Sequence, residues 1–151
     1  MPSNSRFAIA VHIMTMMAWA GDEPLKSEYV ACSVNTNPVV IRRLLCALAK
    51  ARLVVSQTGA AGGSRLARKP GQITLLEIYR AVDAGASFSL HRQPPSDECP
   101  VGMNIENVLG NILGEVDQAI EETLAKITIE KVLRAVEPRS TRALRGRRAG
   151  A

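Results

Sequence analysis

Apolar residues recur three or four positions apart along most of the chain, which predicts a mainly helical fold. One stretch differs, because polar and apolar residues alternate there on both sides of a glycine-rich turn, and this pattern is typical of a β-hairpin. Candidate helix caps are Ser5, Ser27, Asn37 and Thr74, and Pro38 suits the first position of a helix. The expected helices cover residues 5–20, 28–32, 38–51 and 75–84, and the expected strands cover residues 53–58 and 64–67.

A short helix, a tight turn, a longer helix and a hairpin, in that order, describe a winged helix-turn-helix domain. We therefore predict a mainly α fold with a small β-hairpin wing, and we expect residues 1–85 to form this domain. Residues 86–103 contain several prolines and no hydrophobic periodicity, which predicts a loop.

A long amphipathic helix is expected from about Asn104, with apolar residues every four positions and acidic residues on the other face. A single helix that projects beyond a small domain usually buries its apolar stripe against a partner, so we expect a homodimer formed through this helix. Together with a last short helix capped by Thr128 it makes up residues 104–135, and the arginine-rich residues 136–151 are expected to be disordered. The predicted dimerisation residues are Val108, Leu109, Ile112, Leu113, Val116, Ile120 and Leu124.

The formal net charge of +5 is unevenly distributed along the chain. Residues 1–92 contain eleven Lys or Arg and five Asp or Glu, whereas residues 93–138 contain three and nine. A basic front half beside an acidic back half indicates a surface that faces a polyanion, and nucleic acid is the first candidate. The acidic long helix keeps a second interpretation open, in which a protein co-regulator binds there.

Candidate DNA contacts follow from this arrangement. Arg42 and Arg43 lie one turn into the third helix, where they can reach guanine edges or phosphates. Val39 and Val40 can touch thymine methyl groups or pack in the core, and both alternatives stay open. In the hairpin, Arg65 is expected at the wing tip, entering a narrow minor groove, with Ser64 bonding a phosphate. The remaining candidates are Ser5, Arg6, Lys26, Ser27, Asn35, Thr36 and Asn37.

A specific motif spans the hairpin, where residues 59–68 read GAAGGSRLAR and residues 73–75 read ITL. This stretch resembles the Rrf2 family of bacterial transcription regulators, whose wing and following helix read G-x-x-G-G-x-x-L-A-R and then I-T-L. The resemblance extends over residues 3 to about 135. It implies a homodimeric regulator that mostly represses transcription, with the third helix in the major groove of double-stranded DNA and the wing at the minor groove. Because two symmetric helix-turn-helix units bind together, we expect a palindromic operator.

Sensing members of that family hold an iron–sulfur cluster on three closely spaced cysteines before the long helix, but this segment offers only Cys99. His91 and either Asp97 or Glu98 are conceivable additional ligands. Because clusters are normally held by thiolates, we expect no cofactor and no metal. Oxidation of the Cys99 thiol is an alternative signal, although the neighbouring acids are expected to raise its pKa.

Three cysteines without paired spacing predict neither a disulfide framework nor a zinc site, and a reducing cytoplasm fits them best. Cys32 and Cys46 lie in apolar helical stretches and are expected in the core. The apolar run over residues 7–17 is too short to span a bilayer, so no membrane association is expected. Two histidines and no nucleophile beside an orienting base predict that the chain is not an enzyme.

Overall fold

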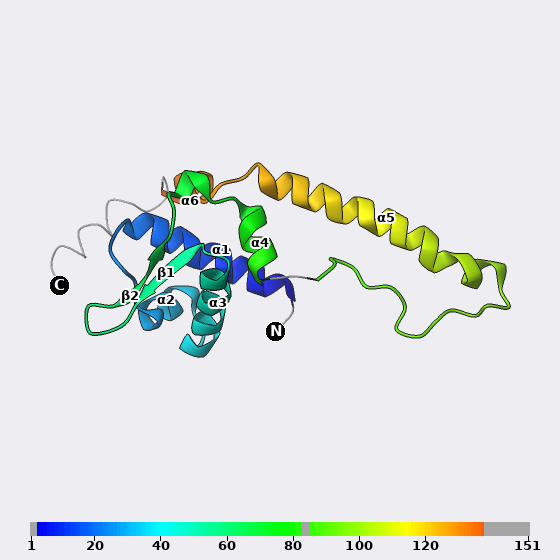
Figure 1. The fold of residues 1–151 in the computed structure, drawn as a ribbon, viewed down its shortest axis with the longest axis horizontal. Coiled ribbons are helices and arrows are strands. Elements are labelled where there is room, and N and C mark those ends of the chain that lie inside the picture. Colours follow the sequence, from blue (N-terminus) through cyan, green and yellow to red (C-terminus); the bar gives the residue numbers. More distant parts are fainter. Residues whose placement is uncertain (1–2, 83–84, 138–151) are drawn as a thin grey trace.

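The computed structural model describes residues 3–82 and 85–137, and it shows a helical body from which a long helical arm extends (Figure 1). The predicted class is confirmed, because the described elements are mainly helices together with one antiparallel hairpin. No helix within these ranges is both long and apolar enough to cross a membrane. In chain order the elements are α1 (Ser3–Ala20), α2 (Ser27–Val34), α3 (Pro38–Lys50), β1 (Val54–Gln57), β2 (Gly63–Leu66), the 3-10 turn η1 (Pro70–Gln72), α4 (Leu75–Val82), α5 (Pro100–Ala125) and α6 (Ile129–Val136).

Three predicted cap residues form hydrogen bonds at helix starts, and two of them, Asn37 and Thr128, begin α3 and α6. The side chain of Asn37 accepts the backbone N–H of Val39 at 2.9 Å, and Pro38 occupies the first position of α3. Thr128 accepts the backbone N–H of Lys131 at 3.2 Å and so begins α6. Both bonds satisfy N–H groups that a helix start otherwise leaves without a partner, which confirms these two boundaries.

The first two helices begin earlier than predicted. α1 begins at Ser3, so Ser5 lies inside the helix and does not cap it. α2 begins at Ser27 itself, and Lys26 takes the N-cap position without a side-chain hydrogen bond. The same helix continues beyond residue 32 until Asn35, whose left-handed conformation (φ 60°) ends it.

The boundaries of α5 and α6 also differ from the prediction. α5 begins at Pro100, so the last residues of the predicted loop 86–103 are helical; proline at the first helical position needs no N–H partner. α6 continues to Val136, where a disordered tail was expected to begin. The remainder of that predicted tail, residues 138–151, lies outside the described residues.

α1 supplies much of the core because it packs against α2, α4, α6 and the hairpin. Its residues Ala10, Ile13, Met14 and Met17 are buried. With few aromatic residues in the chain, aliphatic side chains fill the remaining space. The other fully buried large side chains are Val30, Ile41, Leu44, Leu48, Leu53, Ile73, Ile78 and Ile129.

Two cysteines predicted to lie in the core are exposed instead. Cys32 on α2 and Cys46 on α3 both face solvent. On α3 the buried stripe is formed by Ile41, Leu44, Leu45 and Leu48, and residue 46 falls outside it. The prediction that both cysteines are buried relied on the apolar residues around them in the sequence. It was wrong because the position of a residue around the helix axis decides whether it faces the core.

The last helix, α6, is part of the winged body, which corrects the domain boundary predicted at residue 85. The backbone N–H of Leu75 donates to the carbonyl of Ile127 at 2.8 Å, and that of Ile129 donates to the carbonyl of Ile73 at 3.0 Å. The side chain of Ile129 is fully buried beside α1. The chain therefore returns to the body after the arm, and α6 completes the packing around α1.

The arm consists of α5 and the segment that leads to it from α4 (Figure 1). Near the body it is held by an ion pair of 2.9 Å between Arg80 of α4 and Glu121. The backbone N–H of Ser87 donates to Asp117 at 3.2 Å. No residue of α5 is buried, so within this single chain the arm lacks a core of its own.

Candidate nucleic-acid interface

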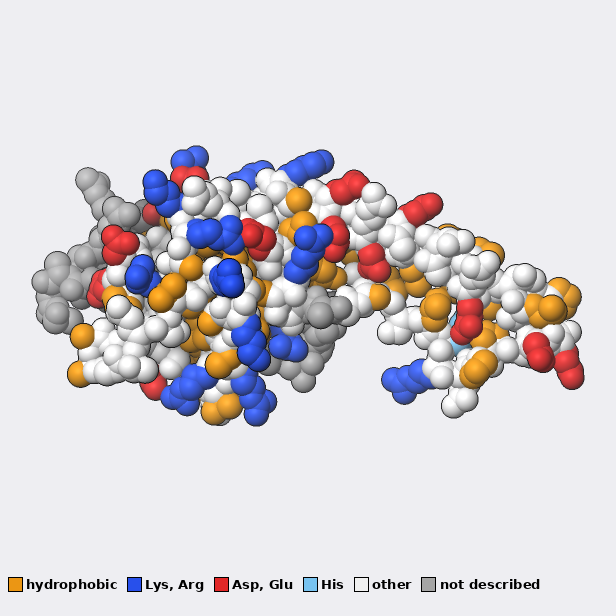
Figure 2. All heavy atoms as spheres, in the orientation of Figure 1, with side chains coloured by type: hydrophobic (Ala, Val, Ile, Leu, Met, Phe, Trp, Pro, Cys, Tyr) orange, Lys and Arg blue, Asp and Glu red, His pale blue; other side chains and the backbone are white. Residues whose placement is uncertain are grey.

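α3 presents a basic face because its apolar positions are used on the opposite side. Ile41, Leu44 and Leu48 are buried, and helical geometry then turns Arg42 and Arg43 toward solvent, where both are exposed. Lys and Arg side chains gather at the lower edge of the body in Figure 2, where α2 and α3 lie in Figure 1. Such a face on the second helix of a helix-turn-helix can meet base edges and phosphates.

The two valines at the start of α3 lie in different environments. Val39 is 46% exposed, whereas Val40 is half-buried and packs against the core. Of the two alternatives left open by the sequence, packing therefore accounts for Val40. Val39 stays a candidate for contact with a thymine methyl group.

Arg42 is paired with a carboxylate that the sequence-based reasoning missed. Its Nη2 donates to Glu28 Oε1 of α2 at 2.8 Å. The backbone at Glu28 and then the Arg42 guanidinium hold the pKa of this carboxyl below its usual range, so it is ionised at neutral pH. The separation of fourteen positions along the sequence explains the omission, because no local pattern connects the two residues.

The other predicted contact residues lie on α1, at the start of α2 or between α2 and α3, and they differ in exposure. Arg6, Lys26, Asn35 and Asn37 are exposed, and Ser5, Ser27 and Thr36 are half-buried. The chain turns from α2 to α3 at Thr36, whose backbone N–H donates to the carbonyl of Ala31 at 3.0 Å. The roles of these residues in DNA binding stay predictions.

The wing differs from the prediction in the placement of Arg65 and Ser64. β1 and β2 pair antiparallel with Arg65 opposite Val55, so this arginine lies in the strand and not at the tip. Ser64 is 5% exposed, and its hydroxyl lies 2.9 Å from that of Ser56. Its backbone N–H also donates to Leu25 at 2.8 Å. Ser64 therefore fixes the wing to the body. Because its hydroxyl is turned inward, the predicted contact between Ser64 and a phosphate is wrong.

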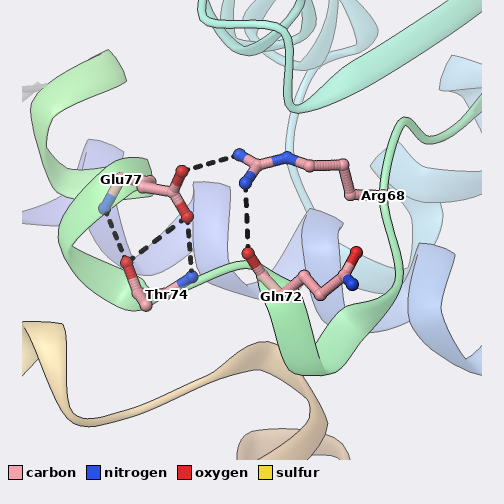
Figure 3. Close-up of polar contacts among 4 residues, drawn as sticks. All are labelled: Arg68, Gln72, Thr74 and Glu77. Atoms are coloured by element: carbon pink, nitrogen blue, oxygen red, sulfur yellow. Dashed lines mark hydrogen bonds and ion pairs between the residues drawn. The ribbon is translucent and has the colours of Figure 1, made fainter.

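A polar cluster connects the end of the wing to α4 (Figure 3). Arg68 donates to Glu77 at 2.6 Å and to the carbonyl of Gln72 at 3.1 Å. Glu77 also accepts the backbone N–H of Thr74 at 3.0 Å, and the Thr74 hydroxyl accepts the N–H of Glu77 at 3.3 Å. This reciprocal capping box confirms Thr74 as the cap, and the spacing of Thr74 and Glu77 in the sequence was a signal for it.

The charge of Glu77 is favoured despite its environment. Partial burial raises the pKa of this carboxyl, but the hydrogen bonds from Arg68 and from the Thr74 backbone outweigh burial, and the net pKa is lowered. The ionised carboxylate therefore links the two elements at neutral pH. Arg68, which belongs to the wing motif, has a structural role in holding the wing against α4.

The predicted dimerisation stripe lies on the arm, where apolar side chains meet solvent. Val108 is 50% exposed and Ile112 is 49% exposed. The stripe changes character toward the body, because Leu124 packs against the core of its own chain. The other predicted members, Leu109, Leu113, Val116 and Ile120, are half-buried. Further exposed apolar residues, missed by the prediction, lie on the arm: Phe88 and Leu90 in the segment before α5, and Val101 and Met103 in the first turn of α5.

Cys99 occupies the N-cap position of α5 and is exposed. The backbone N–H groups of Gly102 and Val101 lower the pKa of its thiol, which is opposite to the predicted direction. The difference arises because α5 begins at Pro100, so the thiol meets the N–H groups of the first helical turn.

Comparison with known families decides the class of this domain. A model of the Rrf2 family, described as iron-dependent transcriptional regulators, matches residues 3–135. The chain belongs to the Rrf2 family. This Rrf2 protein is thus a DNA-binding transcription regulator and not an enzyme, as predicted.

Individual relatives agree with this assignment. The Rrf2 regulator is 41% identical over 130 residues to YwnA of Bacillus subtilis (strain 168), which is named as an HTH-type transcriptional regulator, and the match covers 86% of this chain and 96% of YwnA. The crystal structure of a protein described as DNA-binding is 39% identical with a TM-score of 0.69, covering 85% of this chain and 98% of that chain. IscR of T. potens is 25% identical with a TM-score of 0.67, covering 93% of each chain.

The family description includes iron, but the described residues do not bring together a ligand set that fits an iron cluster. Within residues 3–82 and 85–137, no three His, Cys, Asp or Glu side chains come together as metal ligands. Cys99 lies at the start of α5, whereas Cys32 and Cys46 lie on helices of the body. Cluster ligation by thiolates needs several cysteines at one place. The expectation that no cofactor is bound stays a prediction.

Proposed function

We propose that this Rrf2 regulator binds a palindromic operator as a homodimer and represses transcription there, in the bacterial cytoplasm. The two α3 helices of the dimer enter major grooves about one helical turn, ~34 Å, apart. The observation that carries this proposal is the exposed pair Arg42 and Arg43 on a helix whose opposite face is fixed in the core. A rigid helix with outward guanidinium groups suits the reading of guanine edges.

The wings are proposed to rest on the DNA backbone beside each α3 helix. Arg65 is half-buried within β2, where its guanidinium is suited to a phosphate or to the edge of the minor groove. The tip, residues 58–62, contains no charged residue. Small neutral residues there allow close approach of the hairpin backbone to the duplex.

Dimerisation through α5 is supported by the exposure of its apolar stripe. A helix with no buried residue in its own chain needs a partner to remove that stripe from water. Since the arm extends away from the body (Figure 1), a second copy can pack along it without obstructing α3. An isologous pairing of this kind gives the two-fold symmetry that a palindromic operator requires.

The signal proposed for this regulator is oxidation of Cys99. The lowered pKa of its exposed thiol favours the thiolate, which is the form that attacks a peroxide. Attack by the sulfur on one peroxide oxygen breaks the O–O bond, giving a sulfenic acid and releasing hydroxide, or water after protonation. Cys99 lies at the start of α5, so this product changes the arm that is proposed to form the dimer.

A protein co-regulator on the acidic face of α5 is the alternative. Part of that face is already used within the chain, because Glu121 pairs with Arg80 and Asp117 accepts the N–H of Ser87. We therefore place DNA binding by the homodimer first.

The proposal is tested by selecting binding sites from a random library of double-stranded DNA with the wild-type protein. We expect an inverted repeat, and native mass spectrometry should find two chains on each selected duplex. Arg43→Ala should weaken binding by about tenfold or more, because it removes a base or phosphate contact. Lys131→Ala is the matched control, since it removes an exposed charge from α6, at the opposite edge of the body from α3 (Figure 1). Absence of any enriched sequence, or equal losses in both variants, contradicts the proposal.

A further inference from the structure

Arg42 does not extend freely from α3, because the Glu28 carboxylate of α2 holds its guanidinium at 2.8 Å. The two side chains are 56% and 64% exposed. Exposed ion pairs of this kind contribute little to the stability of a fold. Glu28 also lies in the first turn of α2, where a carboxylate is favoured, but this contribution too is small at an exposed position. Stability is therefore a weak reason for a negative charge within the basic face.

A carboxylate at this place is costly when the face meets DNA. Phosphates repel it, and the repulsion is relieved only while a cation stays beside it. Arg42 is the partner that supplies this cation in the structure. Any complex in which Arg42 leaves Glu28 to reach a phosphate is therefore penalised.

We propose that Glu28 is a positioning residue that determines specificity, by holding Arg42 for a base edge; this inference rests on the DNA-binding function proposed above. A guanidinium carries five N–H donors in one rigid plane. The bond to Glu28 uses one donor and restricts the orientation of that plane. The remaining donors can then form the paired contacts to O6 and N7 of guanine.

The neighbouring cation, Arg43, provides the contrast. Within residues 3–82 and 85–137 it forms no ion pair, although it is exposed on the same helix. An unrestrained guanidinium is suited to phosphates, which position a protein on DNA without reading its sequence. The two adjacent arginines therefore have separate tasks, and Glu28 is the residue that separates them.

Glu28→Gln tests the inference, because glutamine keeps the shape of the side chain and removes its charge. Binding to an unrelated duplex should tighten about threefold to tenfold, and its logarithmic salt slope should steepen by about 1, as Arg42 gains a phosphate. The ratio of affinities for selected and unrelated duplexes should fall by about tenfold. Glu130→Gln is the matched control, since it removes the carboxylate of an exposed 2.9 Å ion pair with Arg134 on α6. This control should leave both the ratio and the slope unchanged.

A double-mutant cycle shows whether Glu28 acts through Arg42. In an Arg42→Ala background, Glu28→Gln should no longer change the specificity ratio. An unchanged ratio in the single Glu28→Gln variant overturns the inference, as does an equal effect in both backgrounds. Far-UV circular dichroism should confirm that each variant is folded.

Failure of this inference is distinguishable from failure of the proposed function. If the wild-type protein shows no sequence preference at all, DNA recognition by this face is refuted. If the wild-type protein prefers its selected site and Glu28→Gln retains that preference, only the role of Glu28 is refuted.

Discussion

Truncation of the exposed stripe on α5 should dissociate the proposed dimer by an amount that the structure allows us to estimate. Val108 and Ile112 are each about half exposed, at 50% and 49%, so a partner can bury the remaining half of each. Replacement by alanine removes about two carbon groups from Val108 and about three from Ile112, and full burial of each group stabilises by about 0.8 kcal/mol. Half of that sum is about 2 kcal/mol for each chain and about 4 kcal/mol for the dimer. The double variant Val108→Ala/Ile112→Ala should therefore raise the dimer Kd by about a thousandfold.

Sedimentation velocity over a dilution series measures this Kd. Gln118→Ala is the control, because Gln118 is exposed and lies on the opposite side of α5 from the stripe. Alanine favours helix at all three positions, so circular dichroism should show that α5 is retained. A dimer Kd that changes less than about threefold in the double variant refutes the assignment of this stripe to the dimer interface.

The remaining predictions concern the body and the thiol. Glu77→Ala should lower the free energy of unfolding by about 1 kcal/mol at pH 7. The pKa of Glu77 is lowered in the fold, so the stabilisation from its carboxylate is complete above the pKa of glutamate in the unfolded chain and is lost as the pH falls. In urea unfolding, the difference in free energy of unfolding between Glu77→Ala and wild type should therefore narrow below about pH 4. Ile129→Ala should cost about 3 kcal/mol because this side chain is fully buried, whereas the exposed Val136→Ala should cost less than about 0.5 kcal/mol; equal thermal shifts would exclude α6 from the body. Cys99→Ser should keep DNA binding and lose its response to peroxide in a gel-shift assay, and a retained response would exclude Cys99 as the sensor.

Local spacing predicted much of the fold. The caps Asn37, Thr74 and Thr128 were identified correctly because a cap bonds to N–H groups two or three residues away. The antiparallel hairpin followed from alternation around a glycine-rich turn. Features set by neighbouring residues were therefore accessible without the structure.

Long-range features were not accessible in this way. The hydrogen bond between Ile129 and Ile73 joins residues that the whole arm separates in the sequence, and such a contact leaves no periodic pattern. The prediction therefore placed α6 outside the body. The direction of the pKa shift at Cys99 was missed for a related reason, because it depends on where α5 begins.

Prediction of the candidate interface shows the same division. The exposure of Arg42 and Arg43 followed from the helical phase of α3, since their buried neighbours are recognisable in the sequence. The inward orientation of Ser64 depends on its contacts with Ser56 and Leu25, which only the folded chain brings together. The pairing of Arg42 with Glu28 likewise needs the packing of α2 on α3.

A salt titration of binding to the selected palindromic duplex tests the central claim most directly, because it measures how many phosphates the basic face neutralises. If about six phosphates are contacted by the two copies, the affinity should fall by roughly a thousandfold between 50 and 200 mM salt. An affinity that does not change with salt, or no binding to the duplex at 50 mM, would contradict the account.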